Sequence, residues 1–264
     1  MTRIICDTMI WYELSKNTIQ VPDPKQYTLV CTKLSLMELA FSPNNLIKLA
    51  EVQAAIREIV KVKPQIILHY PWDHATSLID KDFEFDFEIE EDLAIGYLNF
   101  LLNHPKEELF PDSFKENLED ISSTRRKNFQ EWADFLNNLY GRNNEIKRTL
   151  KKYSDANRHL LDFKKWFIHK LNERELGTYS VDTFPWEQFE FYTSIGASYM
   201  RKMMFSRMKA DGNDENDLRN MIYAQPGDKY WTLEKRWNNL AKEANMTKYF
   251  MCIRTTARRD KFPQ

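Results

Sequence analysis

The chain has 264 residues and a mass of 31.7 kDa, and its 38 basic and 39 acidic side chains leave a net charge of −1. This balance excludes a globally basic nucleic-acid coat and a highly charged disordered chain, while a hydrophobic content of 42% is enough for a core. The sequence has six glycines and neither a G-x-x-x-x-G-K-S/T nor a G-x-G-x-x-G motif, which argues against a nucleotide-binding loop enzyme.

The first 80 residues alternate between strand-like and helix-like patterns. Short apolar and β-branched runs predict strands over residues 3–6, 28–32 and 65–68. Apolar residues at helical spacing predict helices over residues 9–14 and about 45–61. Strands that alternate with helices predict an α/β fold, in which a mainly parallel sheet is covered by helices on both faces.

Another helix is expected directly after the second strand. Ser35 stands three residues before Glu38, which is the spacing of a capping box, so we predict that Ser35 caps this helix. Leu34, Met37 and Phe41 mark its apolar face.

The segment 80–92 is dominated by acidic residues, and apolar residues alternate with them from Phe83 to Ile89. This pattern predicts an edge strand or an extended arm with one solvated face. An acidic arm that covers a basic cleft or a partner is the alternative interpretation.

Residues 91–209 have a helical pattern, which indicates a mostly α-helical insertion. The stripe that contains Phe129, Trp132, Leu136 and Leu139 is typical of core packing. Basic residues are frequent in this region, and they predict either solvated helix faces or a surface that follows phosphates. These basic residues are Arg125, Arg126, Lys127, Arg142, Lys147, Arg148, Lys151, Lys152, Lys164 and Lys165.

The alternating pattern returns near residue 211. Helices are expected over 215–224 and 233–243, and strands over 229–232 and 248–253. We therefore predict a discontinuous α/β domain that comprises residues 1–79 and 210–264, interrupted by the helical insertion 80–209.

The cysteines and the hydropathy of the sequence indicate the cellular compartment of the protein. Cys6, Cys31 and Cys252 each lie in an apolar run, where a thiol usually behaves as a small buried hydrophobe, so no disulfide is expected. No stretch approaches the roughly 20 apolar residues of a membrane helix. We expect a cytoplasmic protein without a membrane partner.

Four acidic residues have positions that suit a shared ligand. Asp7 and Glu234 follow predicted strands, and Glu38 and Asp217 lie on predicted helices. Ligands of an open parallel sheet bind beyond the carboxyl ends of its strands, so these carboxylates are candidates to converge there. Converging carboxylates repel one another unless a cation neutralises them, and oxygen ligands suit Mg²⁺ or Mn²⁺.

At these residues the sequence resembles the PIN domain, a nuclease fold of many toxins and RNA-processing endonucleases. The matching segments are residues 4–14, 28–40 and 216–237. An apolar strand that ends in Asp-Thr is matched by Asp7 and Thr8, and the acid of the next helix by Glu38. Later segments match Asp217 with Ala224, and the T-x-D pattern with Thr232 and Glu234.

The resemblance implies a three-layer α/β/α fold and metal-dependent hydrolysis of a phosphodiester, most often in RNA. Asp7 and Asp217 would be the chief Mg²⁺ or Mn²⁺ ligands. Glu38 would ligate directly or through water, and Glu234 would hold a second ion. Thr8 and Thr232 would position phosphate or a metal-bound water.

The sequence also departs from the family. Met9 stands where Asn is frequent, Glu234 is longer than the usual Asp, and most members lack the insertion. The substrate cannot therefore be taken from the family, and DNA and a homodimer stay open. Asp214 could be an additional ligand, although we interpret it as the N-cap of its helix. The alternative function is a weak or inactive PIN-like protein whose insertion binds RNA or another protein.

Overall fold

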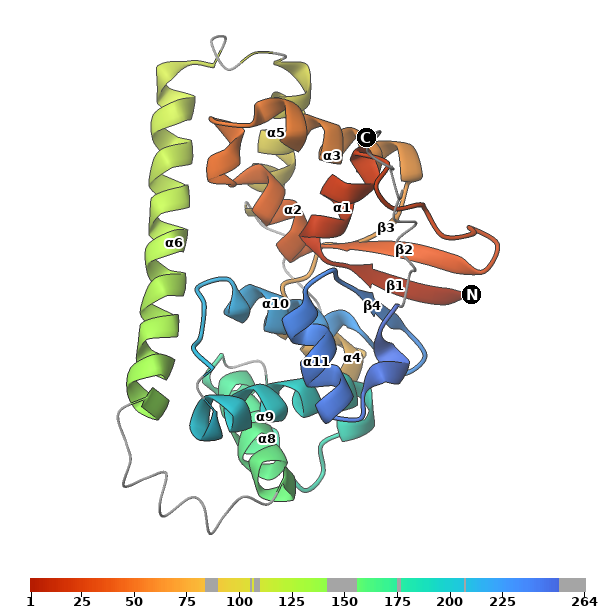
Figure 1. The fold of residues 1–264 in the computed structure, drawn as a ribbon, viewed down its shortest axis with the longest axis vertical. Helices are drawn as coiled ribbons and strands as arrows, with labels where there is room; N and C mark the ends of the chain where they lie inside the picture. Colours follow the sequence, from red (N-terminus) through yellow and green to blue (C-terminus); the bar gives the residue numbers. More distant parts are fainter. Residues whose placement is uncertain are drawn as a thin grey trace, which may run out of the picture.

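The computed structural model describes residues 1–83, 90–104, 106, 110–141, 156–174, 177–206 and 208–251. At its centre lies a four-stranded, all-parallel sheet in the order β3-β2-β1-β4. The strands are β1 Thr2–Cys6, β2 Tyr27–Thr32, β3 Gln65–Ile67 and β4 Lys229–Trp231. The predicted α/β fold with a parallel sheet is thus confirmed, and helices lie above and below the sheet (Figure 1).

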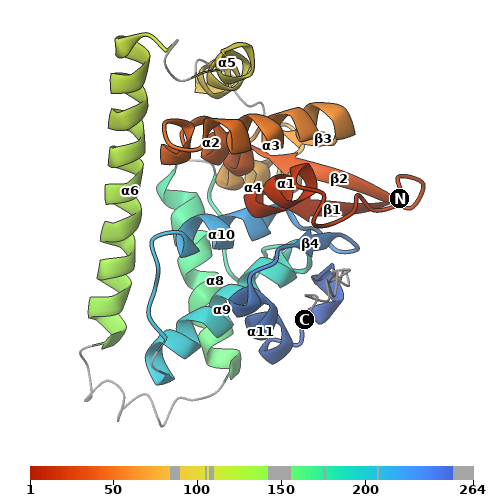
Figure 2. The same ribbon diagram turned by 45° about the horizontal axis from the view of Figure 1, so that its top comes forward.

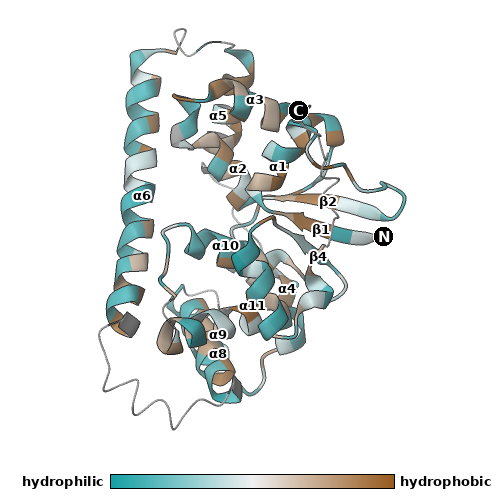
Figure 3. Ribbon diagram, viewed as in Figure 1, coloured by the Kyte–Doolittle hydropathy of each residue, from teal (hydrophilic) through white to brown (hydrophobic). Residues whose placement is uncertain are grey.

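The two faces of the sheet belong to two different cores. In the register, Ile4 pairs with Leu29 and Ile5 with Val30. Successive side chains of a strand point to opposite faces. Accordingly, Ile4 and Leu29 belong to one buried cluster, and Ile5 and Val30 belong to the other. The apolar halves of β1 and β2 are those toward their carboxyl ends (Figure 3).

One face is covered by helices that are mostly close in sequence to the strands. These helices are α1 Thr8–Ser15, α2 Lys33–Ala40, α3 Leu49–Val62 and α5 Glu90–Asn103. The 3-10 helix η1 Pro43–Asn45 precedes α3. The prediction that Ser35 caps α2 is wrong, because Ser35 lies inside the helix. Thr32 is the cap, and its hydroxyl accepts a hydrogen bond from the Ser35 backbone N–H at 3.3 Å.

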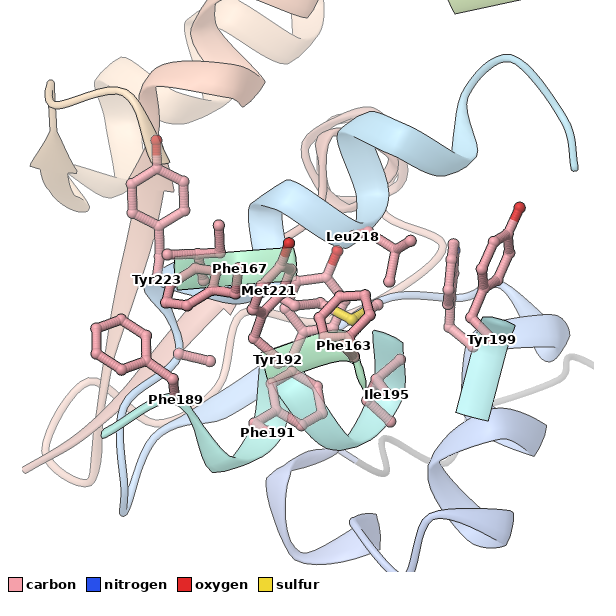
Figure 4. Close-up of a cluster of buried hydrophobic side chains, with 14 of the residues drawn as sticks. Phe163, Phe167, Phe189, Phe191, Tyr192, Ile195, Tyr199, Leu218, Met221 and Tyr223 are labelled. Atoms are coloured by element: carbon pink, nitrogen blue, oxygen red, sulfur yellow. The ribbon is translucent and has the colours of Figure 1, made fainter. Parts of the chain in front are cut away.

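The other face is covered by elements from the middle and the end of the chain. They are α4 Pro71–Ile79, α8 Ala156–Glu173, η4 Trp186–Phe189, α9 Glu190–Phe205, α10 Asp214–Asn220, η5 Met221–Tyr223 and α11 Lys235–Glu243. Phe163, Phe167 and Tyr192 form part of its aromatic core (Figure 4). Gly196 permits the close approach of α8 and α9, since a Cβ there would collide with the Phe163 ring.

The 30-residue helix α6 Asp112–Gly141 stands at one side of the molecule. Figures 1 and 2 show it running past both helical layers, on the side to which the strand arrows point. Its predicted core stripe is only partly buried. Leu136 is buried, whereas Leu139 is exposed and Phe129 is intermediate.

Other expectations need correction or fall outside the described residues. The prediction of a strand from residue 248 is wrong, because Thr247–Tyr249 form the 3-10 helix η6, and Phe250 makes an isolated parallel bridge to Tyr230. Residues 84–89 of the acidic segment, the basic residues 142–152 and the tail from 252 lie outside the described residues, and the acidic segment is helical from Glu90. The division into two domains stays a prediction. In the described part of the chain, no helix is long and apolar enough to cross a membrane.

Candidate functional site

The strand order identifies the edge of the sheet at which a ligand would bind. From β1 the chain proceeds to β2 and β3 in one direction, whereas β4 lies on the opposite side of β1. Such a reversal creates a crevice at the carboxyl ends of the strands. Asp7 directly follows β1, and its backbone N–H donates to the carbonyl oxygen of Trp231, the last residue of β4, at 3.0 Å.

A cavity of about 610 Å³ opens at this edge, and Asp7, Glu38, Asp217 and Glu234 all line it. We call it the acidic cleft. The structure thus brings the four predicted acids together from the end of β1, from α2 and α10, and from the N-cap of α11. The opposite wall belongs to α6 and carries Arg125, Arg126, Phe129 and Gln130.

Asp7 is held at the centre of the cleft by Thr232. The residue is 6% exposed, and its Oδ2 accepts a hydrogen bond from the Thr232 hydroxyl at 2.7 Å. Burial raises the pKa of Asp7, and the hydrogen bond from Thr232 partly opposes this rise. Asp7 precedes the first residue of α1, so the helix dipole also favours its ionised form.

Glu38 is bound by two donors. The Thr8 hydroxyl donates to Oε2, and the Asn216 side-chain amide donates to Oε1 at 2.9 Å. Burial raises the pKa of Glu38. The hydrogen bond from Thr8 lowers this pKa, and the nearby Asp7 charge raises it further. Both threonine hydroxyls of the site therefore orient carboxylates. Their predicted role in positioning phosphate or water stays a prediction.

Asp217 has the most strongly negative surroundings of the four acids. Its Oδ2 accepts a hydrogen bond from the Trp237 indole N–H at 2.8 Å. Burial raises the pKa of Asp217 well above its ordinary value, and the charges of Asp7, Glu234 and Glu38 raise it further. Glu234 is half-buried, and its pKa is raised by burial and by Asp7. A cation in the cleft would relieve this repulsion.

Asp214 has a different place from the one predicted. It does not line the acidic cleft, and the N-cap of α10 is Asn213, so the cap interpretation is wrong. Asp214 is buried in an ion pair with Arg236, and its Oδ2 also accepts from the Tyr199 hydroxyl at 2.7 Å. It thereby fixes the start of α10 to α9 and α11.

The donor set of the cleft fits a hard divalent cation, because it consists of carboxylate oxygens with raised pKa values. Among the described residues, no group of three or more His, Cys, Asp or Glu side chains is yet arranged to hold a metal ion. Oxygens of Asp7, Glu38 and Asp217 accept protein hydrogen bonds, which leave other lone pairs of the same carboxylates for an ion.

Several residues of the site were not predicted from the sequence to belong to it, and Phe129 was assigned to a core stripe. Asn216 holds Glu38, Trp237 holds Asp217, and Phe129 lines the cleft. Arg125 was noted only as part of a basic run, and its position in the cleft depends on where α6 packs. No spacing rule pointed to Asn216, because consecutive residues of a helix point in different directions.

Comparisons with known proteins add no information about this site. No protein-family model, no curated protein and no solved structure matches the chain. The resemblance to PIN domains thus stays a prediction from short motifs.

Proposed function

We propose that this chain is an Mg²⁺- or Mn²⁺-dependent phosphodiester hydrolase of PIN-like fold, acting as an endoribonuclease. One observation carries the proposal: four carboxylates from separate elements line a single cleft at the carboxyl ends of β1 and β4. Their raised pKa values mark a site that is destabilised without a counter-charge. A scaffold would gain nothing from burying such a cluster.

In this proposal Asp7 and Asp217 hold the principal ion, Glu38 ligates directly or through water, and Glu234 holds a second ion. A bound divalent ion lowers the pKa of a water and stabilises charge on the leaving oxygen. Thr232 and Trp237 keep their carboxylates oriented, which limits the rearrangement needed on binding.

The wall formed by α6 supports a nucleic-acid substrate. An acidic cleft alone would repel a polyanion, but Arg125 and Arg126 face it from α6. The Arg125 guanidinium lies 5.9 Å from the Phe41 ring centroid and 5.7 Å from that of Phe129. Arginine planes and aromatic rings are the surfaces on which unpaired bases stack. The preference for RNA over DNA rests on the PIN resemblance.

The direct test is cleavage of labelled single-stranded RNA, structured RNA and single-stranded DNA with Mg²⁺, Mn²⁺ or EDTA. Asp7→Asn removes the charge at nearly constant shape and is expected to abolish cleavage. Asp162→Asn is the matched control, because Asp162 is exposed on α8. Equal activity in wild type and Asp7→Asn would contradict the site. Absence of cutting together with retained RNA binding would favour the alternative of an inactive binding module.

A second test measures metal binding through stability. An ion that binds only the folded chain stabilises it by about 2.7 kcal/mol at 100 times its Kd, which is on the order of 5–10 °C in Tm for a chain of this size. We expect Mn²⁺ to produce such a shift in wild type and in Asp162→Asn but not in Asp217→Asn. A shift of equal size in Asp217→Asn would place the metal elsewhere.

A further inference from the structure

A second cavity adjoins the acidic cleft and has the opposite charge. Its volume is about 350 Å³, and Arg125, Phe129 and Asn216 line both cavities. Arg174 and Arg219 complete its polar lining, and none of its described lining residues is acidic. We call it the arginine cavity.

The three guanidinium groups come from three elements. Arg125 belongs to α6 and donates from one nitrogen to the Met37 carbonyl oxygen at 2.8 Å, which fixes its orientation. Arg174 directly follows α8 and lies 5.9 Å from the Trp72 ring centroid. Arg219 lies on α10 and forms an ion pair with Glu215 one turn earlier.

Arg174 and Arg219 lie close enough for their positive charges to interact. Burial lowers the pKa of Arg174, the Asp73 charge raises it, and the neighbouring Arg219 lowers it again. Each guanidinium group presents a planar fork of N–H donors that suits phosphate oxygens, and three such groups line this one cavity. An anion in the arginine cavity would relieve the repulsion, just as a cation would in the acidic cleft.

The remaining lining suits a nucleobase. Tyr70 and Phe129 are half-buried rings in the cavity wall. A cavity of about 350 Å³ is near the lower limit of about 300–1,000 Å³ for small-ligand sites, so it can take one nucleotide unit but not a double helix. Stacking on aromatic rings is how unpaired bases are commonly held.

We propose that the arginine cavity is a subsite for one nucleotide of a single-stranded substrate, in which Arg125, Arg174 and Arg219 bind a backbone phosphate beside the scissile position. This deepens the proposed nuclease function and rests on it for the identity of the scissile position. The shared residues Arg125 and Asn216 would make the two cavities parts of one strand-binding groove.

The test is binding without cleavage. Fluorescence anisotropy in EDTA measures the affinity of a labelled oligouridylate for wild type, Arg174→Gln, Arg219→Gln and the double variant. Each substitution is expected to weaken binding about tenfold, the value of one charged hydrogen bond. The slope of log K against log salt should become shallower by about 0.7 for each phosphate that the variant no longer neutralises. Arg57→Gln is the charge-matched control, because Arg57 is exposed on α3.

Each outcome decides the proposal. Arg174→Lys and Arg219→Lys keep the charge and should retain most of the salt slope, which separates a missing phosphate interaction from a folding defect. Unchanged affinity and salt slope in the glutamine variants would overturn the subsite. It would also be overturned if the wild-type protein did not bind the oligouridylate, or bound a duplex or an acidic peptide more tightly. Because EDTA removes divalent metal from this assay, arginine-dependent binding without later metal-dependent cleavage would leave the subsite standing and reject the nuclease.

Discussion

The acidic cleft and the arginine cavity share a wall and differ in the sign of their charge. In the cleft, burial and then the charge of Asp7 raise the pKa of Asp217. In the cavity, burial lowers the pKa of Arg174, Asp73 opposes this shift and Arg219 adds to it. Each cavity gathers side chains of like charge where water screens their repulsion less than it does in bulk solvent. The comparison teaches that the fold places two partly buried sites of opposite charge next to each other, and a cation with a phosphodiester strand would suit both.

The largest expected effect comes from loosening one carboxylate of the cleft. Thr232→Val keeps the shape of the side chain but removes the hydroxyl that donates to Asp7 at 2.7 Å. The pKa of Asp7 should rise further, because the hydrogen bond that favours its ionised form is removed. Mn²⁺ affinity and cleavage are expected to fall about 10- to 100-fold, the usual cost of removing a partner of a metal ligand.

Titration calorimetry with Mn²⁺ and initial cleavage rates would measure this change. Thr232→Ser retains the hydroxyl and serves as the control, with values close to wild type. If the valine and serine variants behave alike, the hydroxyl does not orient Asp7.

The next effect concerns stability without metal. The folded-state pKa of Asp217 is raised, so the folded chain binds more protons than the unfolded chain above the ordinary pKa of Asp. Stability from this residue is therefore present at low pH and is lost as pH rises through the folded pKa, the reverse of ordinary acid denaturation. Asp217→Asn should stabilise the metal-free chain at neutral pH.

Thermal melts in EDTA across about pH 5–8 would measure the difference between Asp217→Asn and wild type. The difference between the two proteins is the proper readout, because His74 adds a pH dependence of its own. Burial lowers the pKa of His74 to about 3, so the stability of the folded chain that depends on neutral His74 is lost as pH falls. The gain in Asp217→Asn should grow as pH rises. A constant or shrinking gain would show that repulsion in the cleft is unimportant.

The smallest effect sharpens the cavity side of the comparison. Glu215 forms an ion pair with Arg219 one turn away on α10. Burial raises the pKa of Glu215, so its buried charge already has a desolvation cost that offsets the attraction to Arg219. Glu215→Gln keeps the shape and removes that charge, so stability should change little. The substitution should raise affinity for oligouridylate about twofold, because Arg219 no longer has a competing carboxylate. Unchanged or weaker binding in the anisotropy assay would argue against a phosphate contact by Arg219.

Much of the sheet and of the acidic cleft could be predicted from the sequence. Apolar runs located the four strands to within a residue or two, and acids just past strand ends indicated the edge where Asp7 and Glu234 meet. This worked because strand direction alone decides which edge carries those residues. Helix capping was less predictable, since Thr32 and Ser35 are both good caps and the extended backbone at Thr32 decided between them.

The far wall of the site could not be predicted. Arg125 and Phe129 lie on a 30-residue helix whose polar pattern is equally compatible with a solvated surface. Their place depends on tertiary packing of α6 along both helical layers, which local periodicity does not encode. For the same reason the arginine cavity, which draws on α6, α10 and the end of α8, left no contiguous motif.

The aromatic core of Figure 4 sets a limit on trimming this protein. Ile5 and Val30 of the sheet share that core with Phe167 and Tyr192, which belong to the region between residues 79 and 210. A shortened chain that joins residue 79 directly to residue 210 would leave an apolar face of the sheet open to water and would be expected to aggregate. Minimal versions of the protein must therefore retain α8 and α9, which cover this face of the sheet.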